Sequence, residues 1–130
     1  MSARDLAHFG VLFLNEGRWG DSQVIPADWV GQSAAVHSEL GMFGGYGYSW
    51  WVAHEGEHVP LLKLPDGTYS ARGTGEQILL VLPHLDVVWV HRTRVTSPDQ
   101  KMMHVMGSAR LLRKVLDAHQ PAPRRTPSRP

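Results

Sequence analysis

Two short hydrophobic runs in the second half of the chain are the clearest signal of regular structure. Residues 78–82 read Ile-Leu-Leu-Val-Leu, residues 87–90 read Val-Val-Trp-Val, and residues 83–86 between them read Pro-His-Leu-Asp. Apolar runs of this length, bounded by turn-forming residues, are typical of strands buried on both faces. Proline fixes its own φ, and aspartate tolerates turn geometry. The pattern therefore predicts a strand, a tight turn and an antiparallel strand.

The first residues of the chain have the pattern of an amphipathic helix. Ser2 and Asp5 have the spacing of a capping box, with aspartate in place of glutamate. Apolar residues then recur at the spacing of one helix face, and Gly17 stands where a helix would end. We expect an amphipathic helix of about four turns. Its inward face would carry Leu6, Phe9, Gly10, Phe13 and Leu14.

A second helix is expected over residues 27–35. Pro26 is a favourable residue at the start of a helix, because its missing N–H has no partner there in any case. Trp29 and Val30 are expected to face inward. A glycine-rich stretch follows, with glycines at positions 41, 44, 45 and 47, and it predicts a loop.

Further strands are expected on either side of a polar segment. Tyr46, Tyr48, Trp50 and Val52 alternate with other residues at the period of a strand. The sequence Pro-Asp-Gly at 65–67 predicts a turn, so residues 68–72 should form the next strand. We expect Trp50 and Trp51 to pack in the core and not to contact a ligand.

The last regular element is a helix. Ser108 is expected to cap it, with an apolar face of Leu111, Leu112, Val115 and Leu116 lying across the sheet. Residues 120–130 are rich in proline and arginine and are expected to be a disordered tail. The predicted class is α+β, an antiparallel sheet of about three to five strands flanked by helices in one domain over residues 1–119.

Composition narrows the possible functions. The 130 residues carry a formal net charge of +1, so nothing favours nucleic acid or an anionic membrane as a partner. There is no cysteine, which excludes disulfides and thiolate metal sites. No signal peptide or membrane span is evident, and we expect the chain as written to stay in the cytoplasm.

One motif matches metal chemistry. His54, Glu55 and His58 have the spacing His-Glu-x-x-His of zinc peptidases, whose two histidines bind the metal from adjacent turns of a helix. Gly56 inside the motif and Pro60 after it break helices, so we favour a solvated hairpin tip. Zinc stays as an alternative, and we expect neither a metal nor another cofactor.

The glycines of residues 73–77, Gly-Thr-Gly-Glu-Gln, are a candidate site. Gly73 and Gly75 have no Cβ, so nearby backbone N–H groups can approach a ligand closely. The simpler interpretation is a bulge or bend at the start of a strand. A dinucleotide-binding loop is disfavoured, because the run lacks the last glycine and enters a strand and not a helix.

Five segments in order resemble the C-terminal part of serine hydrolases related to class C β-lactamases, and the resemblance extends to about residue 116. The nearest subgroup contains 6-aminohexanoate-dimer hydrolase and similar esterases. The segments are Ser-Ala-Arg-Asp-Leu-Ala-His-Phe-Gly at 2–10, Ile-Pro-Ala-Asp-Trp-Val at 25–30, Tyr-Gly-Tyr-Ser-Trp-Trp at 46–51, Ser-Ala-Arg-Gly at 70–73 with Gln77, and Pro-His-Leu-Asp-Val-Val at 83–88.

The resemblance implies a partial β-lactamase/transpeptidase-like fold and acyl transfer through a serine. The nucleophile of that family is the serine of Ser-x-x-Lys, a tyrosine of a second motif helps to move the proton, and a third motif of Lys-Thr-Gly type edges the site. Carried over by position, Ala71, Arg72 and Gly73 match the third motif. The N–H of Thr74 would then be the oxyanion donor, with Gly75 beside it. Arg72 could contact a substrate carboxylate.

The departures from the family pattern are as informative as the matches. The 130 residues contain no Ser-x-x-Lys and no Tyr-x-Asn, so the chain has no catalytic nucleophile or base of the family type. Glu76 would place negative charge beside the oxyanion site, where it opposes the transition state. We therefore expect a truncated product or one half of a divided hydrolase, inactive alone and acting on a small ester or amide once completed by the missing N-terminal half.

Two other roles stay open. The chain could be a non-catalytic binding module that keeps the groove beside residues 71–75. It could also be an oligomerisation module in which the surfaces that would meet the missing half associate with a second copy. Relatives are commonly exported to the periplasm or secreted, so the compartment of a full-length protein is not fixed by these residues.

Overall fold

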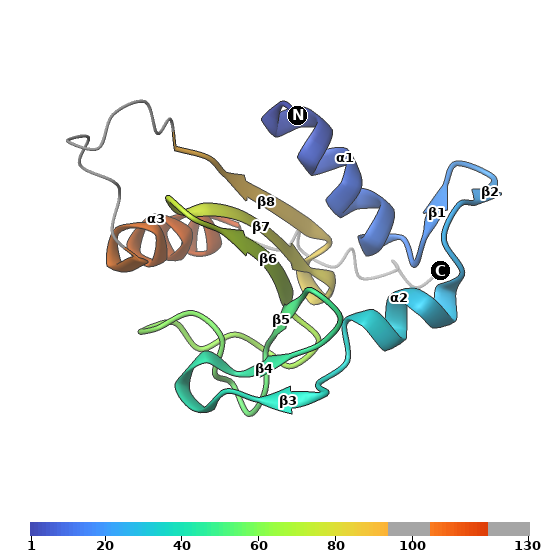
Figure 1. The fold of residues 1–130 in the computed structure, drawn as a ribbon. Coiled ribbons are helices and arrows are strands. Elements are labelled where there is room, and N and C mark those ends of the chain that lie inside the picture. The colour runs from blue at the N-terminus through green and yellow to red at the C-terminus, as the bar shows by residue number, and fades with distance from the viewer. Residues whose placement is uncertain (94–104, 120–130) are drawn as a thin grey trace, which may run out of the picture.

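The computed structural model describes residues 1–93 and 105–119, and they form a sheet with helices on both faces (Figure 1). The helices of this part of the chain are α1 (Ala3–Leu14), α2 (Ala27–Ser33) and α3 (Val105–Ala118), with short 3-10 turns η1 (Gly41–Phe43) and η2 (Pro83–Leu85). The strands are β1 (Arg18–Trp19), β2 (Ser22–Gln23), β3 (Ser38–Glu39), β4 (Gly45–Tyr46), β5 (Trp51–Val52), β6 (Tyr69–Gly73), β7 (Gln77–Leu82) and β8 (Val87–His91).

Strands β3 to β8 form one antiparallel sheet in chain order, and β1 and β2 form a separate hairpin. The α+β class is confirmed. Over the described residues the main sheet has six strands, more than expected, because the two-residue strands β3, β4 and β5 extend it beyond the long strands β6 to β8. The predicted β7, turn and β8 are confirmed, with Asp86 in the left-handed conformation at the turn (φ 55°).

Side chains of β7 divide between two hydrophobic clusters. Leu79 and Val81 pack toward α1 with Phe13, Trp50 and Tyr69. Leu80 and Leu82 pack toward α3 with Leu112. All four β7 leucines and valines are at most 1% exposed, which explains the continuous apolar run in the sequence. Helices α1 and α3 therefore lie on opposite faces of the sheet (Figure 1).

Helix α1 begins as the sequence predicts. The Asp5 N–H donates to Ser2 Oγ at 3.1 Å, and the Ser2 N–H donates to Asp5 Oδ2 at 2.8 Å, which completes the capping box. Gly10 faces the sheet so closely that a Cβ there would lie 2.6 Å from Val88 Cγ1. Glycine thus lets the helix approach β8, which a larger residue would prevent.

Three expectations about the middle of the chain are wrong. The continuous strand over 46–52 is instead the two short antiparallel strands β4 and β5, because the chain turns between them with Ser49 at φ 66°. Trp29 does not face inward: it is 49% exposed, whereas its neighbour Val30 is 5% exposed. Helix α2 ends at Ser33, two residues before the predicted end.

The final helix also differs from expectation. Helix α3 begins at Val105, so Ser108 lies inside it and does not cap it. Leu112 is buried, but Leu111 and Val115 are 40% and 36% exposed. The tail over residues 120–130 and the segment 94–104 lie outside the described residues. No helix in the described part of the chain is long and apolar enough to span a bilayer.

Candidate functional site

The glycine-containing run of the sequence forms the tight loop between β6 and β7. Gly73 pairs with Gln77, which leaves residues 74–76 as a three-residue loop. Gly75 and Glu76 have φ values of 80° and 59°, in the left-handed region that glycine adopts easily and glutamate does not. Thr74 is exposed and has no positive φ. The loop is therefore held in a conformation that costs free energy at Glu76.

Backbone carbonyls of this loop form hydrogen bonds with side chains of β7, β8 and Thr93, which follows β8. The Gly75 carbonyl accepts from Gln77 Nε2 at 3.3 Å and from the Thr93 hydroxyl. Gln77 Nε2 also donates to the Thr93 carbonyl at 2.7 Å, and His91 Nδ1 lies 2.9 Å from the Glu76 carbonyl. These contacts offset the cost of the turn and hold the carbonyls of Gly75 and Glu76 in place.

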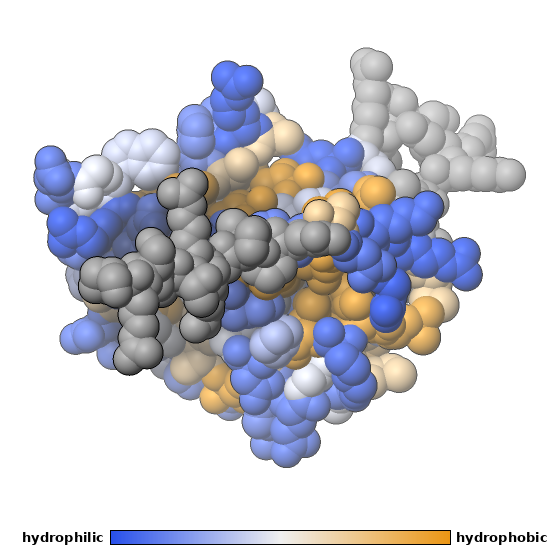
Figure 2. All heavy atoms as spheres, turned by 180° about the vertical axis from the view of Figure 1, so that it is seen from behind, coloured by the Kyte–Doolittle hydropathy of each residue, from blue (hydrophilic) through white to orange (hydrophobic). Residues whose placement is uncertain are grey.

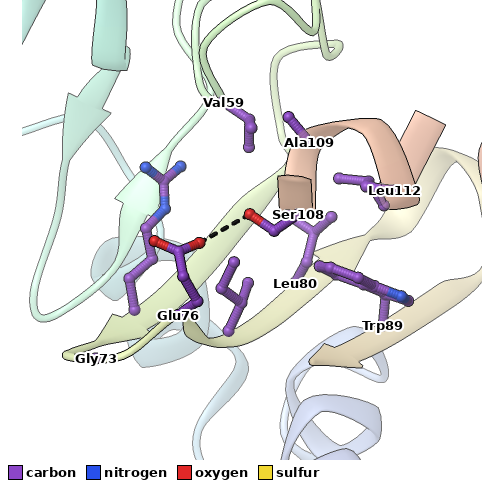
Figure 3. Close-up of a pocket in the computed structure, with 10 residues that line it drawn as sticks. Val59, Gly73, Glu76, Leu80, Trp89, Ser108, Ala109 and Leu112 are labelled. Atoms are coloured by element: carbon purple, nitrogen blue, oxygen red, sulfur yellow. Dashed lines mark hydrogen bonds between the residues drawn. The ribbon is translucent and has the colours of Figure 1, made fainter. Parts of the chain in front are cut away.

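The carboxylate of Glu76 points toward α3. Ser108 Oγ donates to Glu76 Oε2 at 2.8 Å, and Figure 3 shows the two side chains meeting at the edge of a cavity of about 60 Å³. The cavity is otherwise mostly apolar, with Leu80, Trp89 and Leu112 among its lining residues. The side chain of Glu76 is therefore held by α3, and its effect on a developing oxyanion stays a prediction.

Arg72 also lines this cavity. Its Nε donates to Ser70 Oγ at 3.0 Å, and one terminal nitrogen donates to the His58 carbonyl at 2.8 Å. The guanidinium stands 4.8 Å from the ring centroid of Trp51. Burial lowers the pKa of Arg72 to about 10, and the negative charge of Glu76 opposes this shift. The group stays cationic at neutral pH and holds β6 to the segment before it.

The segment that resembles a zinc-peptidase motif is a turn and not a helix. His54 and Glu57 pair as an isolated antiparallel bridge, with Glu55 and Gly56 at φ values of 53° and 79°. His54 lies 3.7 Å from Glu39, whereas His58 is fully buried. Within residues 1–93 and 105–119, no three His, Asp or Glu side chains converge as a metal site requires. The geometry needed for the zinc alternative is therefore absent from these residues.

His58 is a buried neutral histidine. Neither ring nitrogen makes a hydrogen bond of normal geometry within the described residues. Burial lowers the pKa of His58 to about 3, the charge of Arg72 adds to this shift, and the carbonyl of Val52 opposes it. Sequence reasoning assigned His58 to a solvated tip, and only the packing of the following residues against the sheet reveals its burial.

One edge of β6 is only partly paired in the described structure. Strand β5 pairs with β6 only at Tyr69 and Ser70, so residues 71–73 have a strand partner on one side only in the described structure. Ala71 packs toward the α1 side and lines a hollow of about 280 Å³. We call this hollow the aromatic groove, because its walls include Phe9, Trp29, Tyr48 and Trp50. Ala71 and Arg72 thus point to opposite faces of the sheet.

Comparisons with known proteins give one informative similarity. No family model matches the chain, and no curated protein matches it. Among solved structures, a proposed 6-aminohexanoate-dimer hydrolase from Bacillus anthracis is similar with a TM-score of 0.59 and 26% sequence identity. The match covers 90% of this chain and 28% of that protein. The fold of this chain therefore matches part of a β-lactamase-like hydrolase, and the similarity supports the resemblance found in the sequence.

Proposed function

We propose that this chain is the sheet portion of a β-lactamase-like serine hydrolase that cleaves esters or amides through an acyl-enzyme. The observation that carries the proposal is the edge of β6 at residues 71–73, which has no strand partner among the described residues and lies next to a groove lined by Ala71. An open strand edge can hydrogen-bond an extended acyl group, and a tight loop at its end can present an N–H to an oxyanion.

Each residue of the candidate site has a proposed role. Ala71 borders the substrate, the Thr74 N–H donates to the oxyanion, and Gly73 lets the substrate approach the backbone. Gly75 is buried and forms the tight turn beside Thr74 with its φ of 80°. Arg72 positions β6 from the opposite face through Ser70 and the His58 carbonyl. A substrate contact by Arg72 would require its side chain to leave these partners.

The nucleophile and base belong, in this proposal, to polypeptide outside the 130 residues. Two serines near the site do not fit the nucleophile role: Ser70 is fully buried and bonded to Arg72, and Ser108 is 2% exposed and bonded to Glu76. The structurally similar protein is more than three times as long as the matched part, which leaves room for a nucleophile-bearing portion. The partner we propose is therefore the N-terminal portion of the same kind of hydrolase.

The test compares the chain alone with a longer protein. The purified chain should not hydrolyse a chromogenic ester above background and should not be labelled by a fluorophosphonate probe. If the coding sequence upstream encodes Ser-x-x-Lys, the extended protein should do both, and replacing that serine by alanine should abolish both activities. Hydrolysis by the 130-residue chain itself, or an extended protein without serine-dependent activity, would contradict the proposal.

A non-catalytic role as a binding module or a homo-oligomer is the second candidate, and exposed hydrophobic side chains favour it. Trp19, Val24, Trp29, Met42, Tyr48 and Leu61 are each at least 48% exposed. Figure 2 shows hydrophobic residues reaching the surface among hydrophilic ones. Such surface is typical of a face that meets another polypeptide. Light scattering of the purified chain separates a stable dimer from a monomer.

A further inference from the structure

The aromatic groove has rigid walls. Phe9 and Trp50 lie parallel, with ring centroids 6.2 Å apart and planes 6° apart. Trp29 and Tyr48 stack at 5.6 Å and 24°, and His37 stacks on Tyr48 at 4.3 Å and 11°. His37 is itself fixed, because its Nε2 lies 2.8 Å from the Gln32 carbonyl. The ring positions are thus set by packing before any ligand arrives.

The rings of the aromatic groove remain partly exposed to solvent although they stack on one another. Trp29 and Tyr48 are each 49% exposed and Phe9 is 41% exposed, although large aromatic side chains usually bury most of their area. Trp50 is 4% exposed and closes the inner end. The groove therefore offers faces and edges of fixed rings to the solvent.

The chemistry of the groove selects against negative charge. Its lining contains aromatic residues, two serines and Ala71, and none of these side chains is charged at neutral pH. One of the serines, Ser33, is buried and donates its hydroxyl proton to the Val30 carbonyl at 3.0 Å. A carboxylate that entered would lose hydration without gaining an ion pair, and the negative faces of the rings would repel it. A flat apolar group would gain offset-stacked or edge contacts with the rings.

We propose that the aromatic groove binds the flat, uncharged aryl group of an ester or amide substrate. That the ligand is a substrate rests on the proposed function, but binding of the aryl group does not require catalysis. Ala71 places the groove directly beside the open edge of β6, where the ester or amide bond would lie. A hollow of about 280 Å³ accommodates one ring with a short substituent.

The five tryptophans allow a direct test on the full 130-residue chain. Acetanilide, an uncharged aryl amide that does not hydrolyse readily, is titrated while the indole N–H signals are followed by NMR. The signals of Trp29 and Trp50 should shift saturably in the low millimolar range, as expected for a ligand of this size. Those of Trp19 and Trp51 should not, and Trp89 reports separately on the cavity beside Glu76. Zwitterionic 6-aminohexanoate should leave the Trp29 and Trp50 signals unchanged.

A matched pair of variants tests the site itself. Trp29→Leu removes one wall of the groove and should weaken acetanilide binding about fivefold, the effect of losing one aromatic contact. Trp19→Leu replaces a tryptophan of nearly equal exposure, 48%, that lies outside the groove, and it should bind as the unchanged chain does. Thermal unfolding of both variants establishes that each is folded at the temperature of the titration.

Several outcomes would overturn the inference. These are no saturable shift, a shift of Trp89 alone, equal binding of 6-aminohexanoate, or equal weakening in both variants. A shift of Trp29 and Trp50 with protein concentration in the absence of ligand would assign the groove to a second copy of the chain instead. The proposed hydrolase function fails separately, through serine labelling and ester hydrolysis, so binding without catalysis would uphold the groove and refute the enzyme.

Discussion

The hydroxyl of Ser108 donates a 2.8 Å hydrogen bond to the carboxylate of Glu76, and this contact joins α3 to the loop between β6 and β7. The loop carries the N–H proposed as the oxyanion donor, and Glu76 holds a φ of 59° that glutamate seldom adopts. Hydrogen bonds to a charged acceptor are stronger than neutral ones. The last helix of the fold thus fixes a loop at the candidate site.

Removing this contact should destabilise the protein. Glu76→Ala is expected to lower the free energy of unfolding by about 1–3 kcal/mol, with Glu76→Gln losing less because the amide oxygen still accepts. A double-mutant cycle with Ser108→Ala, measured by urea unfolding, cancels the strain change at Glu76 and should give a coupling of about 1 kcal/mol. A coupling near zero would show that the contact does not hold the loop.

The oxyanion role of Thr74 depends on its backbone and not on its side chain. In the longer hydrolase that the proposed function requires, Thr74→Pro removes the N–H and should lower kcat by about 10²–10³, the usual effect of losing one such donor. Thr74→Ala keeps the N–H and should retain most of the activity. Steady-state kinetics with a chromogenic ester measure both variants, after thermal unfolding establishes that both are folded. Equal activity of the two variants would reject Thr74 as the donor.

The close approach of α1 to the sheet should make Gly10 intolerant of a larger residue. Gly10→Ala places a Cβ 2.6 Å from Val88 Cγ1 and 2.7 Å from Leu79 Cδ1. Overpacking costs about 1–3 kcal/mol, whereas alanine gains about 1 kcal/mol in helix propensity, so we expect a net loss. Adding Val88→Ala removes the rigid branched neighbour. The second substitution should therefore cost less in the Gly10→Ala background than in the unchanged chain, as urea unfolding can measure.

Acid should destabilise the fold through His58. Its pKa is about 3 in the folded state and about 6.5 when unfolded, so the unfolded state binds the proton first as the pH falls. The stability contribution is therefore present above pH 6.5 and is lost as the pH falls toward 3. Between pH 7 and 5, a range in which most carboxylates stay ionised, the loss should be about 2 kcal/mol.

His58→Gln provides the control for this pH dependence, because glutamine is polar and does not titrate. Urea unfolding of both proteins at pH 7, 6 and 5 should give a steeper decline for the unchanged chain. Parallel declines would mean that other groups, and not His58, cause the acid sensitivity.

Local signals were enough to predict α1, β6, and the β7 and β8 hairpin. The capping box of Ser2 and Asp5 acts within one turn, and the continuous apolar run of β7 reflects burial on both faces. The sequence also indicated that residues 71–75 lie at the end of a strand and beside a tight loop. These features depend on neighbours close in the chain, so a linear pattern contains them.

Only the tertiary structure decided which side each group faces and what it meets. The alternation over residues 46–52 looked like one strand, but the chain turns within it, with Ser49 at φ 66° and Gly47 packed against the Ser33 carbonyl. Glu76 meets Ser108 from a helix 32 residues away in the sequence, and His58 is buried by packing that its polar neighbours do not indicate. The amino-acid order by itself determined α1, strands β6 to β8 and the candidate loop. The direction of Glu76, the burial of His58 and the aromatic groove depend on contacts between distant segments, which no local period encodes.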